Sequence, residues 1–373
     1  MASRVNNKKL KVAIVCDWLV GIGGAERVVL ELHKMFPDAP IYTSQYDKNK
    51  LDWFNSADVR TTWLQHLPIV LRKFLPILRA WTFSKLDLSS YDLVISATGA
   101  EAKGVKTGPN TKHICYCFAP THYYWSRYEQ YIQHPGFGFL DPIARLGLKL
   151  LVGPLRSWDY KAAQKPDYLI SISNHIQKDI KRYYGRESVI IFPPVDTNRF
   201  KPTKPRIRKG FVTAGRQTPY KRIDLAVAAC SSKNLPLTVI GNGPDHKHLV
   251  DIAGPTISFF TDVADEDMAG YFQSAEAFIF AGLDDFGIVA VEAMAAGTPV
   301  IAYKGGGALD YVIPGKTGLF FDQPTFVSLL RVLKSFRASK FRPGDMEKQA
   351  EKYSPIIFAD SMNKFLNKIL RKK

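Results

Sequence analysis

The chain has 373 residues, of which 46% are hydrophobic and 23% charged, and its 51 basic and 34 acidic residues give a formal net charge of +17. This composition excludes a disordered protein, and the length suits two domains that each bury a core. The cationic excess predicts an anionic partner, either a membrane leaflet, a phosphorylated substrate or nucleic acid.

Targeting and redox signals are sparse. No apolar run reaches the roughly 18 residues of a spanning helix, and the polar start leads into a strand, so we expect neither a signal peptide nor an anchor. The four cysteines are too scattered for a disulfide framework. Cys115 and Cys117 alternate on one predicted strand, where a reduced core pair is favoured over a metal site because no second pair completes one.

The first predicted unit is a strand, a glycine-rich turn and a helix. An apolar run at 11–16 is followed by GIGGAER and a helical pattern at 28–35. This order starts a Rossmann-like half, with Gly23 and Gly24 near the helix amino end. The GxGG spacing lacks the third glycine of the dinucleotide fingerprint, which disfavours a nicotinamide cofactor; a tight turn without a ligand remains an alternative. Further strands of this half are predicted at 92–97, 113–118, 167–172 and 188–192.

Two stretches, 63–86 and 143–158, mix basic with aromatic and aliphatic residues. Such a mixture on helices suits a membrane interface. A core-facing helix with a solvated basic side is the alternative. The basic residues of the two stretches are Arg72, Lys73, Arg79, Lys85, Arg145, Lys149 and Arg156.

The second half begins after a stiff PPVDTNRF segment and a polar linker at 201–210. A strand at 210–214 is followed by Arg216 and Lys221, at the end of that strand and the start of a helix. Two cations and backbone amides there suit a diphosphate; a solvated basic turn is the alternative. In TDVADEDM, Asp265 is predicted to cap the next helix, not to bind a metal.

The stretch 278–319 reads as two buried strands, each followed by a turn and a helix. Asp284 ends the first strand, and Glu292 lies eight residues further, about two turns into the helix. Both carboxylates can therefore point into the crevice at the carboxyl ends of the strands. Gly287, between them, lets backbone approach a bound group. The glycines at 305–307 are predicted to line the same pocket or to form a plain left-handed turn.

This stretch resembles the paired-acid signature of retaining GT-B glycosyltransferases of the glycogen-synthase-like family 4, in which two glutamates are separated by seven residues. Here Asp284 and Glu292 hold the two places, and EAMAAGTPVIA follows. DDFGIVAVEA and PYKRIDLA are similar to bacterial mannosyltransferases of surface-polysaccharide assembly. The resemblance implies an α/β GT-B fold with two Rossmann-like domains facing across a cleft. The acceptor domain would be 1–199, the donor domain 200–350, and 351–373 a helix returning to the first domain.

The resemblance also implies roles for residues. Arg216 and Lys221 would bind the donor diphosphate, Glu292 the ribose, and Asp284 the sugar. Further donor contacts are expected at Val263, Asp285, Phe286, Gly287 and Ile288. Acceptor or sugar contacts are expected at Asp17, Gly23, Gly24, Phe118 and His122.

The resemblance implies transfer of a hexose from GDP-mannose or a UDP-sugar, with mannose favoured, and with no metal and no cofactor. The acceptor would be a lipid-linked sugar or saccharide. We expect a cytoplasmic protein, peripheral on an anionic inner membrane face, with no nucleic-acid partner because no module motif appears.

Two positions depart from the family pattern. Asp284 replaces a glutamate, and Phe118 stands where a histidine is usual, which leaves His122 as the nearby polar candidate. A catalytically weakened sugar-nucleotide binder of the same fold is therefore one alternative. A nucleic-acid-binding protein, which would use the same net charge of +17, is the other.

Overall fold

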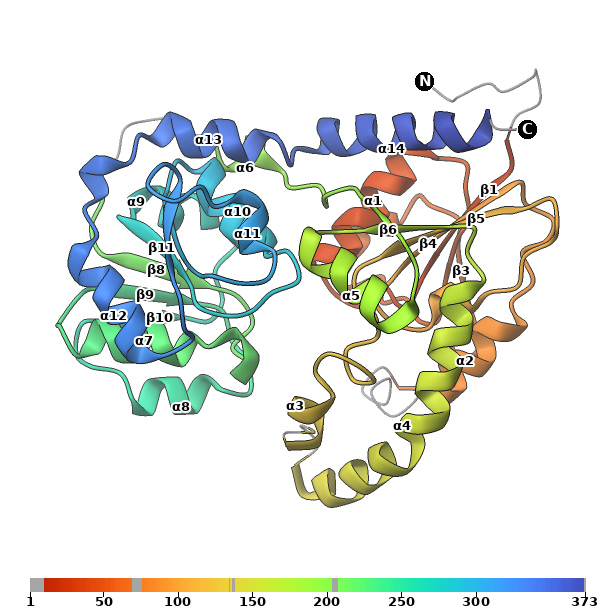
Figure 1. Ribbon diagram of the computed structural model, residues 1–373, viewed down its shortest axis with the longest axis horizontal. Coiled ribbons are helices and arrows are strands. Elements are labelled where there is room, and N and C mark those ends of the chain that lie inside the picture. The colour runs from red at the N-terminus through yellow and green to blue at the C-terminus, as the bar shows by residue number, and fades with distance from the viewer. Residues whose placement is uncertain (1–9, 69–75, 134, 136–137, 203–206, 372–373) are drawn as a thin grey trace. The chain divides into compact units, whose positions relative to one another are not determined.

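The computed structural model describes residues 10–68, 76–133, 135, 138–202 and 207–371. The chain divides into two compact units (Figure 1). The first comprises Met1–Pro193 and Phe358–Lys373, and the second Pro194–Ile357. The division precedes the boundary expected after residue 199. The intervening segment packs with the second unit, where the Val195 amide donates to the Tyr353 carbonyl at 2.8 Å.

In the first unit, seven described strands form one parallel sheet in the order β3-β2-β1-β4-β5-β6-β7. Its central strands are continuous apolar runs such as VAIVC, buried along their whole length, as expected for parallel strands covered on both faces. The strands are β1 (Val12–Cys16), β2 (Ile41–Thr43), β3 (Val59–Thr61), β4 (Leu93–Thr98), β5 (Lys112–Cys117), β6 (Tyr168–Ser171) and β7 (Val189–Ile190).

Helices of the first unit follow the strands and cover the sheet. The α5 helix begins at a capping serine, because Ser173 Oγ accepts from the Ile176 amide at 3.1 Å. Late in the chain, α14 packs on this unit: Phe358 contacts Tyr116 with ring centroids 5.9 Å apart. The helices are α1 (Gly24–Met35), α2 (Pro76–Lys85), α3 (Tyr128–Gln133), α4 (Asp141–Gln164), α5 (Asn174–Tyr184) and α14 (Pro355–Leu370), with the 3-10 helices η2 (Trp63–His66) and η4 (Ala102–Gly104).

In the second unit, six described strands form a parallel sheet in the order β10-β9-β8-β11-β12-β13. The strands are short and apolar, and β8, β11 and most of β9 and β12 are buried. They are β8 (Phe211–Ala214), β9 (Leu237–Ile240), β10 (Ile257–Phe260), β11 (Ala277–Phe280), β12 (Val300–Tyr303) and β13 (Gly318–Phe321).

The helix that carries Glu292, α10, is the most enclosed of the helices that position the site. Its sequence IVAVEAMA is apolar apart from that glutamate, and it packs against β11, β12, α6 and α13. A helix that is apolar all round is a buried helix. The helices of this unit are α6 (Thr197–Phe200), α7 (Ile223–Ser231), α8 (His246–Asp251), α9 (Met268–Ser274), α10 (Ile288–Ala295), α11 (Ala308–Tyr311), α12 (Phe326–Ser335) and α13 (Pro343–Glu351), with the 3-10 helix η6 (Pro219–Lys221).

Each sheet has one point where the chain reverses its direction across the sheet. In the first sheet this switch point lies between β1 and β4, and in the second between β8 and β11. Open α/β sheets bind ligands at the carboxyl ends of the strands beside such a point. A ligand-binding site is therefore expected in the loops that follow these four strands.

Candidate functional site

At the switch point of the second sheet, the structure brings Lys221 and Asp284 together. Lys221 ends η6 in the loop after β8, and Asp284 lies in the loop after β11. The lysine Nζ donates to Asp284 Oδ2. The two loops touch through backbone, because a Cβ at Gly282 would lie 2.8 Å from the Lys221 Cα. Only glycine permits this approach, so the ion pair is built into the packing of the two loops.

The Asp284 carboxylate is buried and incompletely satisfied. The residue is 7% exposed, and within the described part of the chain its Oδ1 has no hydrogen-bond partner. A buried acceptor without a partner costs free energy, about 1–3 kcal/mol. Such an atom at a switch point is suited to accept a hydrogen bond from a ligand hydroxyl.

A glycine turn after β12 supports the Asp284 loop from behind. Gly306 has φ +59, and a Cβ there would lie 2.3 Å from the Asp284 carbonyl oxygen. The Gly307 amide donates to that carbonyl at 2.9 Å. The turn is therefore left-handed and fixes the backbone that carries Asp284.

The Phe286 side chain belongs to the core. It is 2% exposed, and its ring contacts those of Tyr311 and Tyr353 with centroids 5.5 and 5.4 Å apart. Any ligand contact from this residue would come from its backbone. Gly287 follows with φ +91 as the N-cap of α10, and Asp285 and Ile288 beside it are half-buried.

Glu292 lies on α10 and is 8% exposed. Its partner is a residue that the sequence analysis did not single out: Arg199 Nη2 lies 3.5 Å from Glu292 Oε1. The same guanidinium contacts Asp265 through Nη1 at 2.6 Å. The only sequence signal for this contact was the positive charge within PPVDTNRF, a segment interpreted as a stiff connection before the second half.

The predicted helix cap at Asp265 is wrong. The N-cap of α9 is Asp267, and no side chain there makes a capping hydrogen bond. Asp265 instead pairs with Arg199, because the loop after β10 passes beside α6. Val263 lies in the same loop and is half-buried.

Arg216 lies two residues after the end of β8, and its side chain is exposed. Among the described residues it forms no ion pair with Asp284 or Glu292. The structure therefore places Arg216 in the same loop as Lys221 without joining it to the acids.

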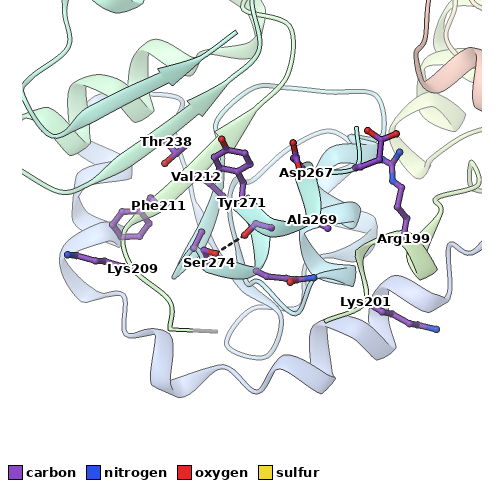
Figure 2. A pocket seen from close by; sticks show the side chains of 14 residues that line it. Arg199, Lys201, Lys209, Phe211, Val212, Thr238, Asp267, Ala269, Tyr271 and Ser274 are labelled. Carbon is purple, nitrogen blue, oxygen red and sulfur yellow. Dashed lines mark hydrogen bonds between the residues drawn. The ribbon is translucent and has the colours of Figure 1, made fainter. Parts of the chain in front are cut away.

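A shallow hollow lies beside α9 and is lined in part by Arg199 (Figure 2). Arg199 and Lys201 lie on one side of it, and Lys209 and Phe211 on the other. Two of its lining residues are hydrogen-bonded to each other: Ser274 Oγ donates to the Gly270 carbonyl at 2.7 Å. Lys221 and Asp284 are not among its lining residues.

At the switch point of the first sheet, the Asp17 carboxylate is bound by groups of the loop after β4. Asp17 follows β1 and accepts from Thr98 Oγ1 at 2.8 Å and from the Ala102 amide at 2.8 Å. The amides of Gly99 and Ala100 donate to it as well. Burial raises the pKa of Asp17, the nearby Glu101 charge raises it further, and the hydrogen bonds oppose both.

A carboxylate offers about four lone-pair sites, so these donors occupy Asp17. The predicted sugar contact at this residue is therefore replaced by a structural one that ties β1 to the loop after β4.

The glycine turn before α1 is similarly closed. Gly23 is the N-cap of α1, and Gly24 is the first residue of that helix. A Cβ at Gly23 would lie 2.7 Å from Glu26 Oε2. The turn thus accommodates a carboxylate of the chain itself, which agrees with the alternative of a tight turn without a ligand.

Phe118 and His122 lie in the loop after β5 and are half-buried. The Phe118 ring packs edge-on against Tyr116, with centroids 5.7 Å apart. His122 Nδ1 lies 2.8 Å from Ser126 Oγ. The acceptor role of these two residues stays a prediction.

Two buried ion pairs join the surface helices of this unit to η4. On α2, Arg79 Nε lies 2.8 Å from Glu101 Oε2, and on α4, Asp159 Oδ1 lies 2.6 Å from Lys103 Nζ. Arg79 is 4% exposed. Its assignment to a membrane-facing basic set is therefore wrong, because a buried guanidinium is held by its carboxylate partner.

The aromatic residues after β5 pack into the same network. Tyr123 and Tyr124 hydroxyls donate to Glu101 Oε1, and Trp125 Nε1 donates to Asp159 Oδ2 at 2.7 Å. These contacts hold the three aromatic side chains within the packing of the first unit.

Outside this network, both helices carry exposed apolar faces. On α4, Ile143, Leu146 and Leu150 are 69%, 59% and 69% exposed and share one face. Of the basic residues predicted there, Lys149 is exposed, whereas Arg156 is half-buried and donates to the Tyr124 carbonyl at 2.6 Å. On and near α2, the exposed apolar residues are Trp63, Ile77, Leu78 and Trp81. The predicted cations Arg72 and Lys73 lie outside the described residues.

Two kinds of feature are absent from the described residues. None of their helices has the length and apolar character needed to cross a membrane. None of their histidine, cysteine, aspartate and glutamate side chains gather in a group of three that could hold a metal ion.

Known proteins resemble this chain in sequence and in fold. Residues 194–353 match the family model described as Glycosyl transferases group 1. The D-inositol 3-phosphate glycosyltransferase of Streptomyces avermitilis is 28% identical over 205 residues, which are 46% of this chain and 44% of that protein. The GDP-mannose-dependent alpha-mannosyltransferase of Mycolicibacterium smegmatis is 34% identical over 118 residues, 31% of each chain. The chain thus spans less than half the length of these curated relatives.

A solved structure extends the likeness to the whole fold. Anabaena HepE in complex with UDP-glucose superposes with a TM-score of 0.68 at 16% identity, covering 96% of this chain and 100% of that chain. With two doubly wound parallel sheets, this likeness defines the GT-B fold and confirms the predicted fold class. Over residues 194–353, the second unit of the chain is similar to the group 1 glycosyl transferases.

Proposed function

We propose that the protein is a retaining glycosyltransferase that moves a hexose, mannose by preference, from a nucleotide diphosphate sugar to a lipid-linked or saccharide acceptor. The observation that carries the proposal is the Lys221–Asp284 pair at the switch point of the second sheet, with Asp284 Oδ1 buried and unpartnered among the described residues. The relative from Mycolicibacterium smegmatis, named as GDP-mannose-dependent, supports mannose. A role in polysaccharide assembly is part of the same proposal.

Different residues of the second unit bind different groups of the donor, and two cations bind its diphosphate. Lys221 carries three N–H donors, so it can keep its contact with Asp284 and also donate to a phosphate. Arg216, exposed in the same loop, supplies the second cation. These charges balance the negative charge that grows on the diphosphate as the glycosidic bond breaks, and preorganised cations lower such a barrier. They supply this stabilisation without a metal ion in the proposed mechanism.

The proposed step retains the anomeric configuration. The bond from the sugar C1 to the phosphate oxygen breaks as the acceptor oxygen bonds to C1 on the same face. The acceptor proton passes to the departing phosphate oxygen, so that a nucleoside diphosphate and the glycosylated acceptor are the products. Asp284 Oδ1 accepts from a sugar hydroxyl, and Glu292 accepts from the ribose.

We further propose that the acceptor is met at an anionic membrane surface. The apolar face of α4 and the exposed residues of α2 are suited to an interface, and the net charge of +17 favours an anionic leaflet. The protein would then act at the cytoplasmic face of the membrane as a peripheral protein.

A thermal-shift panel of GDP, UDP, ADP, GDP-mannose and UDP-glucose tests the donor. A ligand at about 100 times its Kd stabilises the native state by about 2.7 kcal/mol, which raises the unfolding midpoint of a unit of this size by roughly 5–10 °C. We expect GDP and GDP-mannose to give the largest shifts.

Release of nucleoside diphosphate on addition of a lipid-linked sugar then tests transfer. Binding without release with any acceptor would favour the weakened sugar-nucleotide binder. No shift with any nucleotide would remove the proposed function.

A further inference from the structure

In the sequence between β7 and β8 lies the short helix α6, whose Arg199 contacts Glu292, the acid predicted to bind the ribose. This helix, α6, is fixed at both ends: Asp196 is its N-cap and accepts from the Arg199 amide at 3.4 Å. Phe200 is fully buried, and its ring contacts Phe272 of α9 with centroids 5.7 Å apart. The Arg199 guanidinium lies over the Phe200 ring, 4.5 Å from its centroid. The arginine is therefore presented from a rigid base.

The guanidinium bridges two carboxylates from different parts of the second unit. It lies 2.6 Å from Asp265, in the loop after β10, and 3.5 Å from Glu292, on α10. The Asp265 side chain is 47% exposed and that of Glu292 only 11%. The Asp265 contact is the shorter of the two, whereas the Glu292 contact is the better shielded from solvent.

We propose that Arg199 is a positioning residue for nucleotide recognition, and that it orients the Glu292 carboxylate toward the ribose hydroxyls of the donor. The inference rests on the proposed function, because it concerns the nucleoside diphosphate part of the same site. A carboxylate accepts about four hydrogen bonds, so a guanidinium contact and two ribose hydroxyls can be held together. By holding Asp265 at the same time, Arg199 keeps the loop after β10, with Val263, beside the nucleotide.

The alternative is a purely structural role, in which Arg199 joins α6 to α10 and the loop after β10. The two roles differ in what the arginine does for the ribose 2′-hydroxyl. A structural role affects ribonucleotides and deoxyribonucleotides equally, whereas orientation of Glu292 matters only when the hydroxyl is present.

The test compares the Kd values of GDP and 2′-deoxy-GDP, and of UDP and 2′-deoxy-UDP, by calorimetry on the full chain. A hydrogen bond to a charged group contributes about 1.5–3 kcal/mol, so the wild type should bind the ribonucleotide about 10- to 100-fold more tightly than its deoxy counterpart. In Arg199→Met this ratio should fall to near one, as in Glu292→Gln, with the Kd of the deoxynucleotide little changed. Arg199→Lys, which keeps the charge, should retain part of the ratio.

Lys201→Met is the matched control. Lys201 follows α6 directly, and its Nζ lies 3.6 Å from Glu351 instead of Glu292. This variant should keep the wild-type ratio.

The outcomes separate the inference from the function on which it rests. An equal loss of affinity for both sugars in Arg199→Met would make the arginine structural and overturn the inference. A wild type that binds both sugars equally would also overturn it, while leaving the proposed function in place. A wild type that binds neither GDP nor UDP would refute the proposed function itself. If Arg199→Met does not fold, the affinity ratio in Arg199→Lys decides. A wild-type ratio in Arg199→Lys, together with a lost ratio in Glu292→Gln, would mean that positioning of Glu292 requires only the positive charge at residue 199.

Discussion

The buried Lys103–Asp159 ion pair should be indispensable to the stability of the first unit. Lys103 and Asp159 side chains are both fully buried, with Nζ 2.6 Å from Oδ1. In Lys103→Met the methionine fills the volume but leaves the Asp159 charge without its cation. Removing one partner of a buried pair costs about 3–5 kcal/mol. Hydroxyls of Thr121 and Tyr184 still donate to Asp159, so we expect the lower end of that range.

The control is Lys112→Met, which removes an exposed pair with Asp167 whose atoms are 4.0 Å apart. Exposed pairs contribute about 0–1 kcal/mol.

Tryptophan fluorescence during thermal unfolding measures both effects, because the six tryptophans all lie in the first unit. A unit of roughly 200 residues should lose about 6–12 °C in its thermal midpoint for 3 kcal/mol. If Lys103→Met costs no more than Lys112→Met, the reasoning about buried charge in this unit is refuted.

Three further predictions concern other parts of the molecule. Gly282→Ala should lower nucleotide affinity, since its Cβ would lie 2.8 Å from the Lys221 Cα, whereas Gly344→Ala has open space and should not; calorimetry with GDP measures both. Burial lowers the pKa of His113 to about 3, so protonation below the unfolded pKa of about 6.5 favours the unfolded state, and stability should fall by about 2 kcal/mol between pH 7 and pH 5. Leu150→Asp should reduce sedimentation with anionic vesicles, while Val327→Asp, on an exposed position of the second unit, should not.

Each of these has a contradicting result. Equal GDP affinity in the two glycine variants would remove the argument from backbone contact. A His113→Gln variant with the same pH slope as the wild type would assign the slope to other groups. Full recovery of wild-type protein in the supernatant at low salt would remove the membrane proposal.

Most of the fold was predictable because its strands are continuous buried apolar runs. Residues 11–16 and 92–97 coincide with β1 and β4 to within one residue at their ends. The strands β2 and β3 were missed: each has three residues, too few for a periodic or apolar signal to stand out. Their pairing is fixed by the neighbouring β1, which is a tertiary effect.

The site was predictable where residues adjoin the carboxyl ends of strands. Lys221 and Asp284 follow β8 and β11, which are neighbours in the sheet, so the sequence pattern was enough to expect them together. Arg199 was not predictable, because its partners Asp265 and Glu292 are distant in sequence and meet it only through folding.

Charge patterns misled where a charge had a buried partner. The basic residue Arg79 matched an amphipathic surface pattern but pairs with Glu101 inside the first unit. Asp17 looked like a ligand-binding acid at a strand end, yet it accepts hydrogen bonds from the loop after β4. In both cases the partner lies in a segment that local patterning does not connect to the charge.

The most direct test of the central claim is sugar transfer by Lys221→Ala, measured as nucleoside diphosphate released per enzyme with the donor that the thermal-shift panel selects. The matched control is Lys233→Ala, an exposed lysine that precedes β9 and so lies toward the amino ends of the strands, opposite the ends that carry the site. We predict a loss of about 100-fold or more in kcat for Lys221→Ala, wild-type turnover for Lys233→Ala, and unchanged circular dichroism for both. Wild-type turnover by Lys221→Ala would contradict the assignment of the donor diphosphate to the switch point of the second sheet.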